Sequence, residues 1–570
     1  MVRSGKETIM YLPEEKKVVV AENLCSGCGI CVKKCLFNAI SIVNLPEPLV
    51  GEETHRYGVN GFVLYSLPNI REGKVTGIIG ANGTGKTTIV KILSGKLKPN
   101  LGDPNASPSW DDIITKFRGT ELQNYLKKLA NNKVKVVVKP ERIEGIKLQI
   151  KATVKQVLHK IDERSIMDEI VEFMNLKHLL NRKISDLSGG ELQTIAVVAA
   201  CMRDADLYIF DEPTNFLDIF QRIKIAKLIR GLLENGKSVL VVEHDLAILD
   251  YLSDYIHVMY GVPGVYGVVS GPYGCREGIN AFLEGYLPSE NMRIRKGAIE
   301  FKRLSLSKKQ EHSEEKIVEY SNLLKSFDNS FTLKVEAGTI YAGEIIGCVG
   351  PNGIGKTTFI KLLAGVLQCD QGAVYLKPEA IAYKPQHISP SFDGTVEELL
   401  KSIAGSKFNT DIYRTEIIQR LSLEKLLDRE VKDLSSGELQ RVAIASTLSR
   451  DADIYLLDEP SAHLDVEQRY AIVKAIRRLI EGTRKAAIIV EHDITTLEAI
   501  SDRIIVFSGK PGIEGFAAQP ASLKRGLNNL LKELDITLRV DRKTGRPRVN
   551  KPGSRLDSLA RSTGQYLIYA

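Results

Sequence analysis

The stretch that decides the fold is Gly80-Ala-Asn-Gly-Thr-Gly85-Lys86-Thr87, which recurs as Gly350-Pro-Asn-Gly-Ile-Gly355-Lys356-Thr357. Each copy follows an apolar run, 75–79 or 344–349, that predicts a buried strand. A glycine-rich loop between a strand and a helix points backbone N–H groups at phosphates, its lysine neutralises their charge, and the next hydroxyl binds Mg²⁺. The predicted phosphate contacts are Gly80, Asn82, Gly83, Gly85, Lys86, Thr87 and Thr88 in the first loop and Gly350, Asn352, Gly353, Gly355, Lys356, Thr357 and Thr358 in the second.

The motifs that follow each loop keep the same order and spacing. A Leu-Ser-Gly-Gly-Glu signature begins at Leu187 and a Leu-Ser-Ser-Gly-Glu signature at Leu434. In both halves, 23 positions separate the signature serine from the aspartate of an Asp-Glu pair, and a histidine follows that aspartate after 33 or 34 positions. A chance match of one loop is therefore excluded, and the chain is predicted to contain two nucleotide-hydrolysing units.

The two units differ in one long stretch. From Lys86 to Glu141 is 55 positions, whereas from Lys356 to the corresponding Gln386 is 30 positions. The additional residues fall within 101–138, where apolar residues recur at helical spacing. We expect a small helical hairpin there.

Acidic pairs end two of the predicted parallel strands, which is where open α/β sheets place functional side chains. The strands at 207–210 and 454–457 lead into Asp211-Glu212 and Asp458-Glu459. We expect the aspartates to hold the magnesium shell and the glutamates to polarise the attacking water. The histidines that follow the next strands would contact the γ-phosphate. The predicted catalytic residues are Glu212, Glu459, His244 and His492, and the predicted magnesium residues are Thr87, Asp211 and Glu141 in one site and Thr357, Asp458 and Gln386 in the other.

The signature serines have a structural interpretation as well as a functional one. Ser188 and Ser435 each precede a glutamate by three positions, which is the pattern of a helix capping box. A helix N-terminus opened by serine and glycine is also an anion site, suited to a phosphate held on another surface. The two interpretations are compatible.

Four cysteines near the N-terminus have the spacing of a bacterial-ferredoxin run, Cys-x2-Cys-x2-Cys-x3-Cys. An iron-sulfur cluster is favoured over a zinc site. In two-cluster ferredoxins the fourth cysteine serves the other cluster, and residues 1–24 contain no second run. We therefore expect one 4Fe-4S cluster at most and an upstream half that is missing. The candidate ligands are Cys25, Cys28, Cys31 and Cys35, whereas Cys201, Cys275, Cys348 and Cys369 are predicted to be buried hydrophobic residues.

Composition narrows the class of protein. The 570 residues are too many for one core, and 43% hydrophobic with 26% charged residues is typical of a globular protein. No signal peptide and no apolar run of membrane-spanning length is found, so we expect a cytoplasmic protein without membrane contact. The net charge of +8 permits a polyanionic partner. Residues 541–562 hold seven Lys or Arg against two Asp, a composition that fits a solvated tail and an RNA contact equally.

Taken together, these motifs resemble the ATP-binding cassette (ABC) superfamily, whose nucleotide domains meet head to tail. The resemblance implies that ATP on Lys86 is covered by the second signature and ATP on Lys356 by the first. It also implies an aromatic residue stacked on each adenine, although aromatic residues at such positions also serve as core. The candidates are Ser188, Gly189, Gly190, Ser435, Ser436 and Gly437 for the signatures and Tyr57 or Phe62, and Phe327 or Phe331, for the adenines.

Two residues depart from the cassette pattern. Glu141 stands where the family has the glutamine seen at Gln386, and Ser436 replaces the first glycine of its signature. Both changes fall on the composite site around Lys86. We expect this site to turn over more slowly than the site around Lys356.

The cysteine run joined to twin cassettes resembles the ribosome-recycling ATPases of archaea and eukaryotes, the RNase L inhibitor family. The resemblance includes segments 39–46, 117–125, 285–295 and 545–553. It implies that the last two segments form a hinge and that the insertion contacts the small ribosomal subunit and its rRNA. ATP-driven closure would split ribosomes, with a translation release factor as a second partner and with both cassettes paired inside one monomer.

The predicted fold class is α/β, with two ABC-type P-loop domains in tandem after a small ferredoxin-like segment. Alternatives are a cassette ATPase acting on another macromolecular complex and the ATPase subunit of a transporter. A DNA-repair cassette protein, an electron carrier and a non-enzymatic scaffold fit the motifs less well. The predicted divisions are 1–47 for the iron-sulfur segment, 48–284 for the first cassette, 285–314 for the first hinge, 315–530 for the second cassette and 531–570 for the basic C-terminal hinge and tail.

Overall fold

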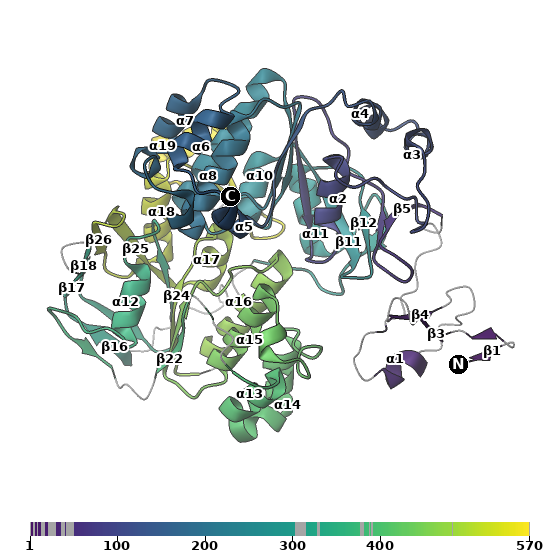
Figure 1. Cartoon of the computed structure of the whole chain (residues 1–570). Helices are drawn as coiled ribbons and strands as arrows, with labels where there is room; N and C mark the ends of the chain where they lie inside the picture. The colour runs from purple at the N-terminus through teal and green to yellow at the C-terminus, as the bar shows by residue number, and fades with distance from the viewer. Residues whose placement is uncertain are drawn as a thin grey trace.

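The computed structural model describes residues 2–3, 6–7, 9–12, 17–20, 30–35, 40, 51–301, 315–327, 331–376, 381–386, 388, 392–481 and 483–568. Cys25 and Cys28 of the predicted cluster and residues 302–314 of the predicted first hinge lie outside them. Two α/β units occupy most of the molecule, with a small N-terminal part at one end (Figure 1). Among the described helices, none is both long and apolar enough to cross a membrane.

The two units contain sheets with the same strand order. In the first sheet the neighbours are β5 (Glu53–Arg56), β6 (Val63–Tyr65), β12 (Tyr266–Val269), β11 (Tyr255–Val262), β7 (Val75–Gly80), β10 (Ser238–Val242), β9 (Leu207–Asp211) and β8 (Val136–Lys139), with β13 (Tyr273–Gly274) beside β11. In the second they are β17 (Leu323–Phe327), β18 (Phe331–Val335), β26 (Glu514–Ala517), β25 (Arg503–Lys510), β20 (Ile345–Val349), β24 (Ala486–Val490), β23 (Ile454–Asp458) and β22 (Ile381–Lys384), with β27 (Ala521–Ser522) beside β25. This repetition confirms the predicted tandem α/β fold.

Parallel central strands bring the predicted site residues to one edge of each sheet. Strands β7, β10 and β9 are buried along their whole length, as the continuous apolar runs predict. Val242 pairs with Asp211 across β10 and β9, so the histidine loop and the acidic pair emerge together. Asp458 pairs with Val490 in the same way.

Helices cover the sheets and carry the signatures. Those of the first unit are α2 (Lys86–Leu93), α5 (Glu144–Gln149), α6 (Val154–Ile161), α7 (Met167–Phe173), α8 (Gly189–Met202), α9 (Ile219–Gly231), α10 (Leu246–Leu252) and α11 (Cys275–Glu284). Those of the second are α12 (Lys356–Leu363), α13 (Val396–Ala404), α14 (Asp411–Tyr413), α15 (Ser436–Leu448), α16 (Val466–Glu481) and α17 (Ile494–Ile500). Helices α2 and α12 each begin at the lysine of a phosphate loop.

Two helices occupy the insertion of the first unit: α3 (Trp110–Lys116) and α4 (Glu121–Ala130). Ser109 caps α3 through a capping box with Asp112. Leu122 and Leu126 of α4 are buried in the same cluster as Ile89 of α2. The helical hairpin therefore packs on the same face of the first sheet as α2, the helix that follows the phosphate loop.

The C-terminal segment packs on the first unit although it follows the second in sequence. It comprises α18 (Leu523–Glu533), β28 (Leu538–Val540), β29 (Pro547–Val549), α19 (Arg555–Thr563) and β30 (Leu567–Ile568). Leu527 and Leu531 of α18 share a core with Ile248 and Leu252 of α10. The C-terminal residues are therefore a structural element between the units.

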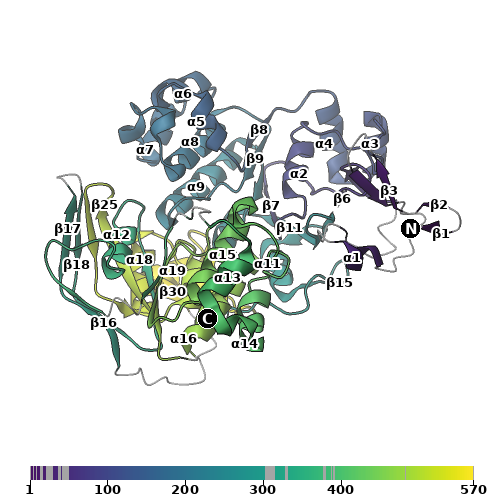
Figure 2. The ribbon, with the colours of Figure 1, turned by 60° about the horizontal axis from the view of Figure 1, so that its bottom comes forward.

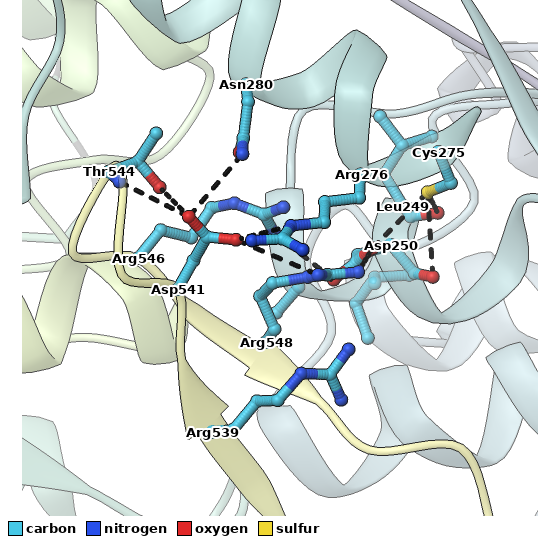
Figure 3. A network of polar contacts seen from close by, with 12 residues as sticks. Leu249, Asp250, Cys275, Arg276, Asn280, Arg539, Asp541, Thr544, Arg546 and Arg548 are labelled. Atoms are coloured by element: carbon cyan, nitrogen blue, oxygen red, sulfur yellow. Dashed lines mark hydrogen bonds and ion pairs between the residues drawn. The ribbon is translucent and has the colours of Figure 1, made fainter. Parts of the chain in front are cut away.

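Buried ion pairs strengthen this contact (Figure 3). Asp250 of α10 accepts hydrogen bonds from Nε and Nη2 of Arg548 at 2.7 and 3.0 Å and lies 3.3 Å from Nη1 of Arg546, which is fully buried. Burial would raise the pKa of Asp250, but these two arginines hold it below its usual value. Asp541 adds a second acceptor, 3.0 Å from Nε of Arg276.

These contacts add a third role, burial in ion pairs, for part of the basic residues 541–562. Arg546 and Arg548 are paired with Asp250, Lys543 lies 2.6 Å from Glu284, and Arg561 is paired with Asp535. Arg546 and Arg548 thus neutralise a carboxylate inside the protein, whereas Arg542, Lys543, Lys551, Arg555 and Arg561 are exposed. Sequence composition cannot distinguish these cases because the carboxylate partners of Arg546 and Arg548 are almost 300 residues away.

The N-terminal part lies beside the first unit in both views, near β5 in Figure 1 and near α3 in Figure 2. It includes β1 (Val2–Arg3), β2 (Lys6–Glu7), the antiparallel pair β3 (Ile9–Leu12) and β4 (Lys17–Val20), and α1 (Ile30–Lys34). Asn60 joins it to the first unit by donating to the carbonyl of Val20 at 3.0 Å and accepting from its N–H at 2.7 Å.

Candidate active site

Both phosphate loops adopt the conformation that their glycines predict. Gly85 and Gly355 have φ of 97° and 98°, in the left-handed region that favours glycine. Nζ of Lys86 donates to the carbonyls of Gly80 and Ala81 at 3.0 and 2.9 Å, and Lys356 makes the equivalent bonds in the second loop. Both lysines are buried, and burial lowers the pKa of each.

The aromatic candidates divide into two kinds. A Cβ on Gly85 would lie 2.7 Å from the ring of Phe62, and one on Gly355 would lie 3.0 Å from the ring of Phe331. Phe62 and Phe331 therefore pack against the loop glycines, and Phe62 also lines the cavity around Lys86. Tyr57, by contrast, is 40% exposed, and its hydroxyl lies 3.4 Å from that of Thr88. The equivalent residue is Phe327 at the end of β17, so Tyr57 and Phe327 are the better placed of the candidates to stack on adenine.

The acidic pair of the first site meets its histidine. Nε2 of His244 lies 3.3 Å from Oε1 of Glu212, and Asn215 donates to the other oxygen of the same carboxylate. Burial alone would raise the pKa of Glu212, but His244 and the charge of Lys86 hold it at about 2. Burial and the neighbouring Glu212 raise the pKa of Asp211 to about 7. Glu212 is thus kept ionised, as a group that polarises water must be.

The second site has the same arrangement with one exchange. His492 lies 3.2 Å from Oε1 of Glu459, and Gln386 donates to that oxygen at 2.8 Å. Burial alone would raise the pKa of Glu459, but His492 and the charge of Lys356 lower it to about 2.

The residues predicted to bind Mg²⁺ fit a hard cation. The Asp458 carboxylate is fully buried, and among the residues that the structure describes neither of its oxygens is satisfied by a hydrogen bond. Burial raises the pKa of this carboxylate, although the Thr357 hydroxyl is near enough to oppose that rise. Carboxylate and hydroxyl oxygens are ligands that Mg²⁺ prefers. Asp211 is equally enclosed, at 3% exposure.

Glu141 distinguishes the first site from the second. It lines the same cavity as Lys86, Asp211 and Glu212, where desolvation and the charge of Glu212 raise its pKa. Gln386 in the second site is neutral and donates a hydrogen bond to its glutamate. The first site therefore holds an additional carboxylate where a phosphate would bind.

A cavity of about 680 Å³ joins the two units at the first site. Its walls combine Lys86 and Thr87 of the first unit with Ser435, Ser436 and Gly437 of the second. This is the head-to-tail arrangement that the resemblance implies for ATP on Lys86.

Two aspartates cross the interface in a symmetrical manner. Oδ2 of Asp465 accepts from the backbone N–H of Asn82 at 3.1 Å, and Oδ2 of Asp218 accepts from that of Asn352 at 2.7 Å. A Cβ on Gly190 would lie 3.8 Å from the amide nitrogen of Asn352, so the first signature adjoins the second loop. Each phosphate loop is thus contacted by the opposite unit.

The signature serines also cap helices. The backbone N–H of Ser188 donates to Glu191 at 2.7 Å, and that of Ser435 donates to Glu438 at 2.8 Å. The two serines are therefore helix caps, as the capping-box pattern predicts. Ser435 caps its helix and also lines the cavity between the units.

Asp218, Asp465 and Asn215 are among the interface residues that were not predicted. The aspartates had a signal in the sequence, because each lies seven positions after the aspartate that ends its strand, in both halves. Asn215 had none, since the equivalent position in the second half is Ala462.

The predicted cluster ligands are only partly placed. Cys31 lies in α1 and Cys35 directly follows it, and both are half-buried and outside any disulfide. Within the described ranges, no three or more His, Cys, Asp or Glu side chains are grouped so as to hold a metal ion. Of the scattered cysteines, Cys201 and Cys348 are buried as predicted, whereas Cys275 and Cys369 are half-buried.

Comparisons with known proteins agree with the geometry. The family described as "ABC transporter" matches residues 68–215 and 333–462. The translation initiation factor RLI1 of Saccharomyces cerevisiae is 45% identical over all of this chain and 94% of its own length. A structure of an archaeal ribosome recycling factor, aABCE1, in complex with the archaeal ribosomal stalk protein aP1 is 52% identical, with a TM-score of 0.87 over 91% of this chain and 99% of that one. A solved structure named RNase-L inhibitor is also 52% identical, with a TM-score of 0.86 over the same shares. This chain therefore belongs to the RNase L inhibitor family of twin-cassette ABC ATPases, as the cysteine run and the paired phosphate loops predict.

Proposed function

We propose that this chain is an ATPase that uses ATP-driven closure of its two cassettes to split ribosomes into subunits during translation recycling. The observation that carries the proposal is the cavity formed by the Lys86 loop and the opposite signature. Because neither cassette contains a complete site, ATP bound there contacts both and favours their closure. Hydrolysis removes that differential contact and permits opening.

In this mechanism the chain's own groups have separate tasks. Lys86 and Lys356 neutralise phosphate charge, and Glu212 and Glu459 accept hydrogen bonds from the attacking water. His244 and His492 orient these carboxylates, to which they are already adjacent. Mg²⁺, held by the threonine and aspartate of each site, would stabilise the charge that develops on the phosphate oxygens.

Relatives connect this closure to the ribosome. One is named a translation initiation factor, and another is a ribosome recycling factor in complex with a ribosomal stalk protein. We propose that this chain acts on the same machinery, with the helical hairpin α3–α4 at the small subunit and a release factor as a second partner. The hairpin is fixed to the first cassette by its buried leucines, so it would move with that cassette on closure.

Co-sedimentation with small ribosomal subunits tests this function. We expect the chain to sediment with subunits at moderate salt in a non-hydrolysable ATP analogue and to remain in the supernatant with ADP. A Lys86→Ala, Lys356→Ala double variant is the control and should not sediment in either nucleotide. Absence of sedimentation of the unmodified chain with the analogue would contradict the proposed partner.

We also propose that Cys31 and Cys35 are ligands of one 4Fe-4S cluster, together with Cys25 and Cys28. Anaerobic purification should yield about four irons and four sulfides per chain. Cys31→Ser should lower the iron content, whereas Cys369→Ser, a half-buried cysteine of the second cassette, should leave it unchanged. An iron content that is the same in Cys31→Ser as in the parent would refute the assignment.

A further inference from the structure

The two catalytic glutamates are each held by one side-chain amide, but the amides come from different loops. Gln386, which follows β22, donates to Glu459 in the second site. Asn215, three residues after Glu212, donates to it in the first site. The counterpart of Gln386 in the first half is Glu141, and the counterpart of Asn215 in the second half is Ala462. Among the described residues, each catalytic carboxylate therefore has one side-chain amide donor, and the two donors come from non-equivalent positions of the repeat.

The backbone around these positions is the same in both halves. Glu212 and Glu459 both have φ of 48°, and the residues four positions later, Phe216 and His463, both have φ of 63°. A side chain at 215 or at 462 therefore leaves an equivalent backbone, and the difference between the sites is chemical. The side chain of Ala462 has no donor to offer to the Glu459 carboxylate, whereas the side chain of Asn215 at the equivalent position reaches the Glu212 carboxylate.

We propose that Asn215 is a positioning residue that replaces the missing glutamine amide of the first site. The Glu212 carboxylate has His244 on one oxygen and Asn215 on the other, so its orientation toward an attacking water is restricted at both ends. Glu141 cannot take this role, because an ionised carboxylate has no proton to donate. This proposal rests on the proposed ATPase function and deepens it.

The use of Asn215 in place of a glutamine also changes which loop holds the catalytic glutamate of the first site, Glu212. Asn215 lies in the loop that continues to Asp218, whose carboxylate accepts from the backbone N–H of Asn352 in the opposite cassette. The carbonyl of Phe216 in the same loop accepts from the side-chain amide of Asn352 at 3.3 Å. Gln386, by contrast, holds Glu459 from within its own cassette. The first-site glutamate is thus positioned by a loop that the other cassette stabilises.

The test uses the full chain carrying Glu459→Gln, in which hydrolysis is confined to the first site. We expect Asn215→Ala to lower kcat by about 10- to 100-fold, which is the usual cost of misplacing a catalytic group. The KM for ATP should be unchanged. Adding Glu141→Gln to that variant should restore most of the rate, because it returns the amide to the position used by the second site. A merely structural role for Asn215 would give no such rescue.

A mirrored pair keeps the test decisive if Asn215→Ala fails to fold. In the chain carrying Glu212→Gln, Gln386→Ala should slow the second site and Ala462→Asn should restore it. The proposal is overturned if Asn215→Ala leaves kcat unchanged or if adding Glu141→Gln has no effect. It is also overturned if Ala462→Asn does not restore the rate of the Gln386→Ala variant. If the parent chain hydrolyses no ATP, the proposed function fails first and this inference with it, so the two failures are distinguishable.

Discussion

Replacing Glu459 by glutamine is expected to leave less ATP hydrolysis than replacing Glu212 by glutamine. Loss of the group that polarises water should slow the affected site by about 10²- to 10⁴-fold. The hydrolysis that remains then reports the other site. The first site contains the additional carboxylate of Glu141 and is covered by a signature with Ser436 in place of glycine. Asn215 compensates for the lost amide of the first site, but not for this additional negative charge.

Single-turnover assays of the two variants measure this difference. ATP binding should be the same in both, because the lysines of the phosphate loops are intact, and a fluorescent ATP analogue provides that control. Ser436→Gly in the Glu459→Gln chain should raise the remaining rate. Equal residual rates in the two variants would show that the sites are equivalent and would disprove the expected asymmetry.

Asp250→Ala is expected to weaken the attachment of the C-terminal segment to the first cassette by about 3–5 kcal/mol. The substitution would leave Arg546, which is fully buried, and Arg548 without their shared carboxylate (Figure 3). An uncompensated buried charge is the costly outcome of breaking such a pair. Because α10 begins two residues after His244, loosening this helix should also slow hydrolysis at the first site.

Hydrogen exchange of the amides in β28 and β29 measures this effect directly, since it reports local opening in a chain of several domains. Asp204→Ala is the matched control. Asp204 pairs with Lys237 at 2.9 Å, but its side chain is 55% exposed, so its removal should cost at most about 1 kcal/mol. Exchange in β28 and β29 that is as slow in Asp250→Ala as in the parent would show that the apolar core alone holds the segment.

Much of the fold could be predicted from the sequence because the informative motifs are local. A phosphate loop needs glycines that accept a positive φ, a lysine and a threonine within eight consecutive residues, and a buried parallel strand needs an unbroken apolar run. The strands β7, β9, β20 and β23 accordingly lie where the apolar runs predict them. The family and the tandem fold were confirmed for the same reason.

The predictions were less complete where a residue's role depends on a distant partner. Arg546, Arg548 and Arg561 were interpreted from composition, which says nothing about the carboxylates of α10 and of the C-terminal segment itself with which they pair. Tyr57 and Phe62 were equivalent in sequence terms, because only the packing of the Phe62 ring against Gly85 separates them. Asn215 could not be identified, since the equivalent position in the second half is Ala462 and the repeat therefore shows no shared residue there.

Local chemistry in the chain was thus sufficient to establish two phosphate loops, two acidic pairs and two signatures, because each motif is complete within a few residues. Only the tertiary structure decided which residues join the two units, which amide holds each glutamate, and which carboxylate binds the buried Arg546 and Arg548. Asn82 and Asp465, for example, are 383 positions apart. Such pairs are selected by the packing of whole domains, and a contact between distant residues leaves no periodicity or spacing in the sequence from which it could be inferred.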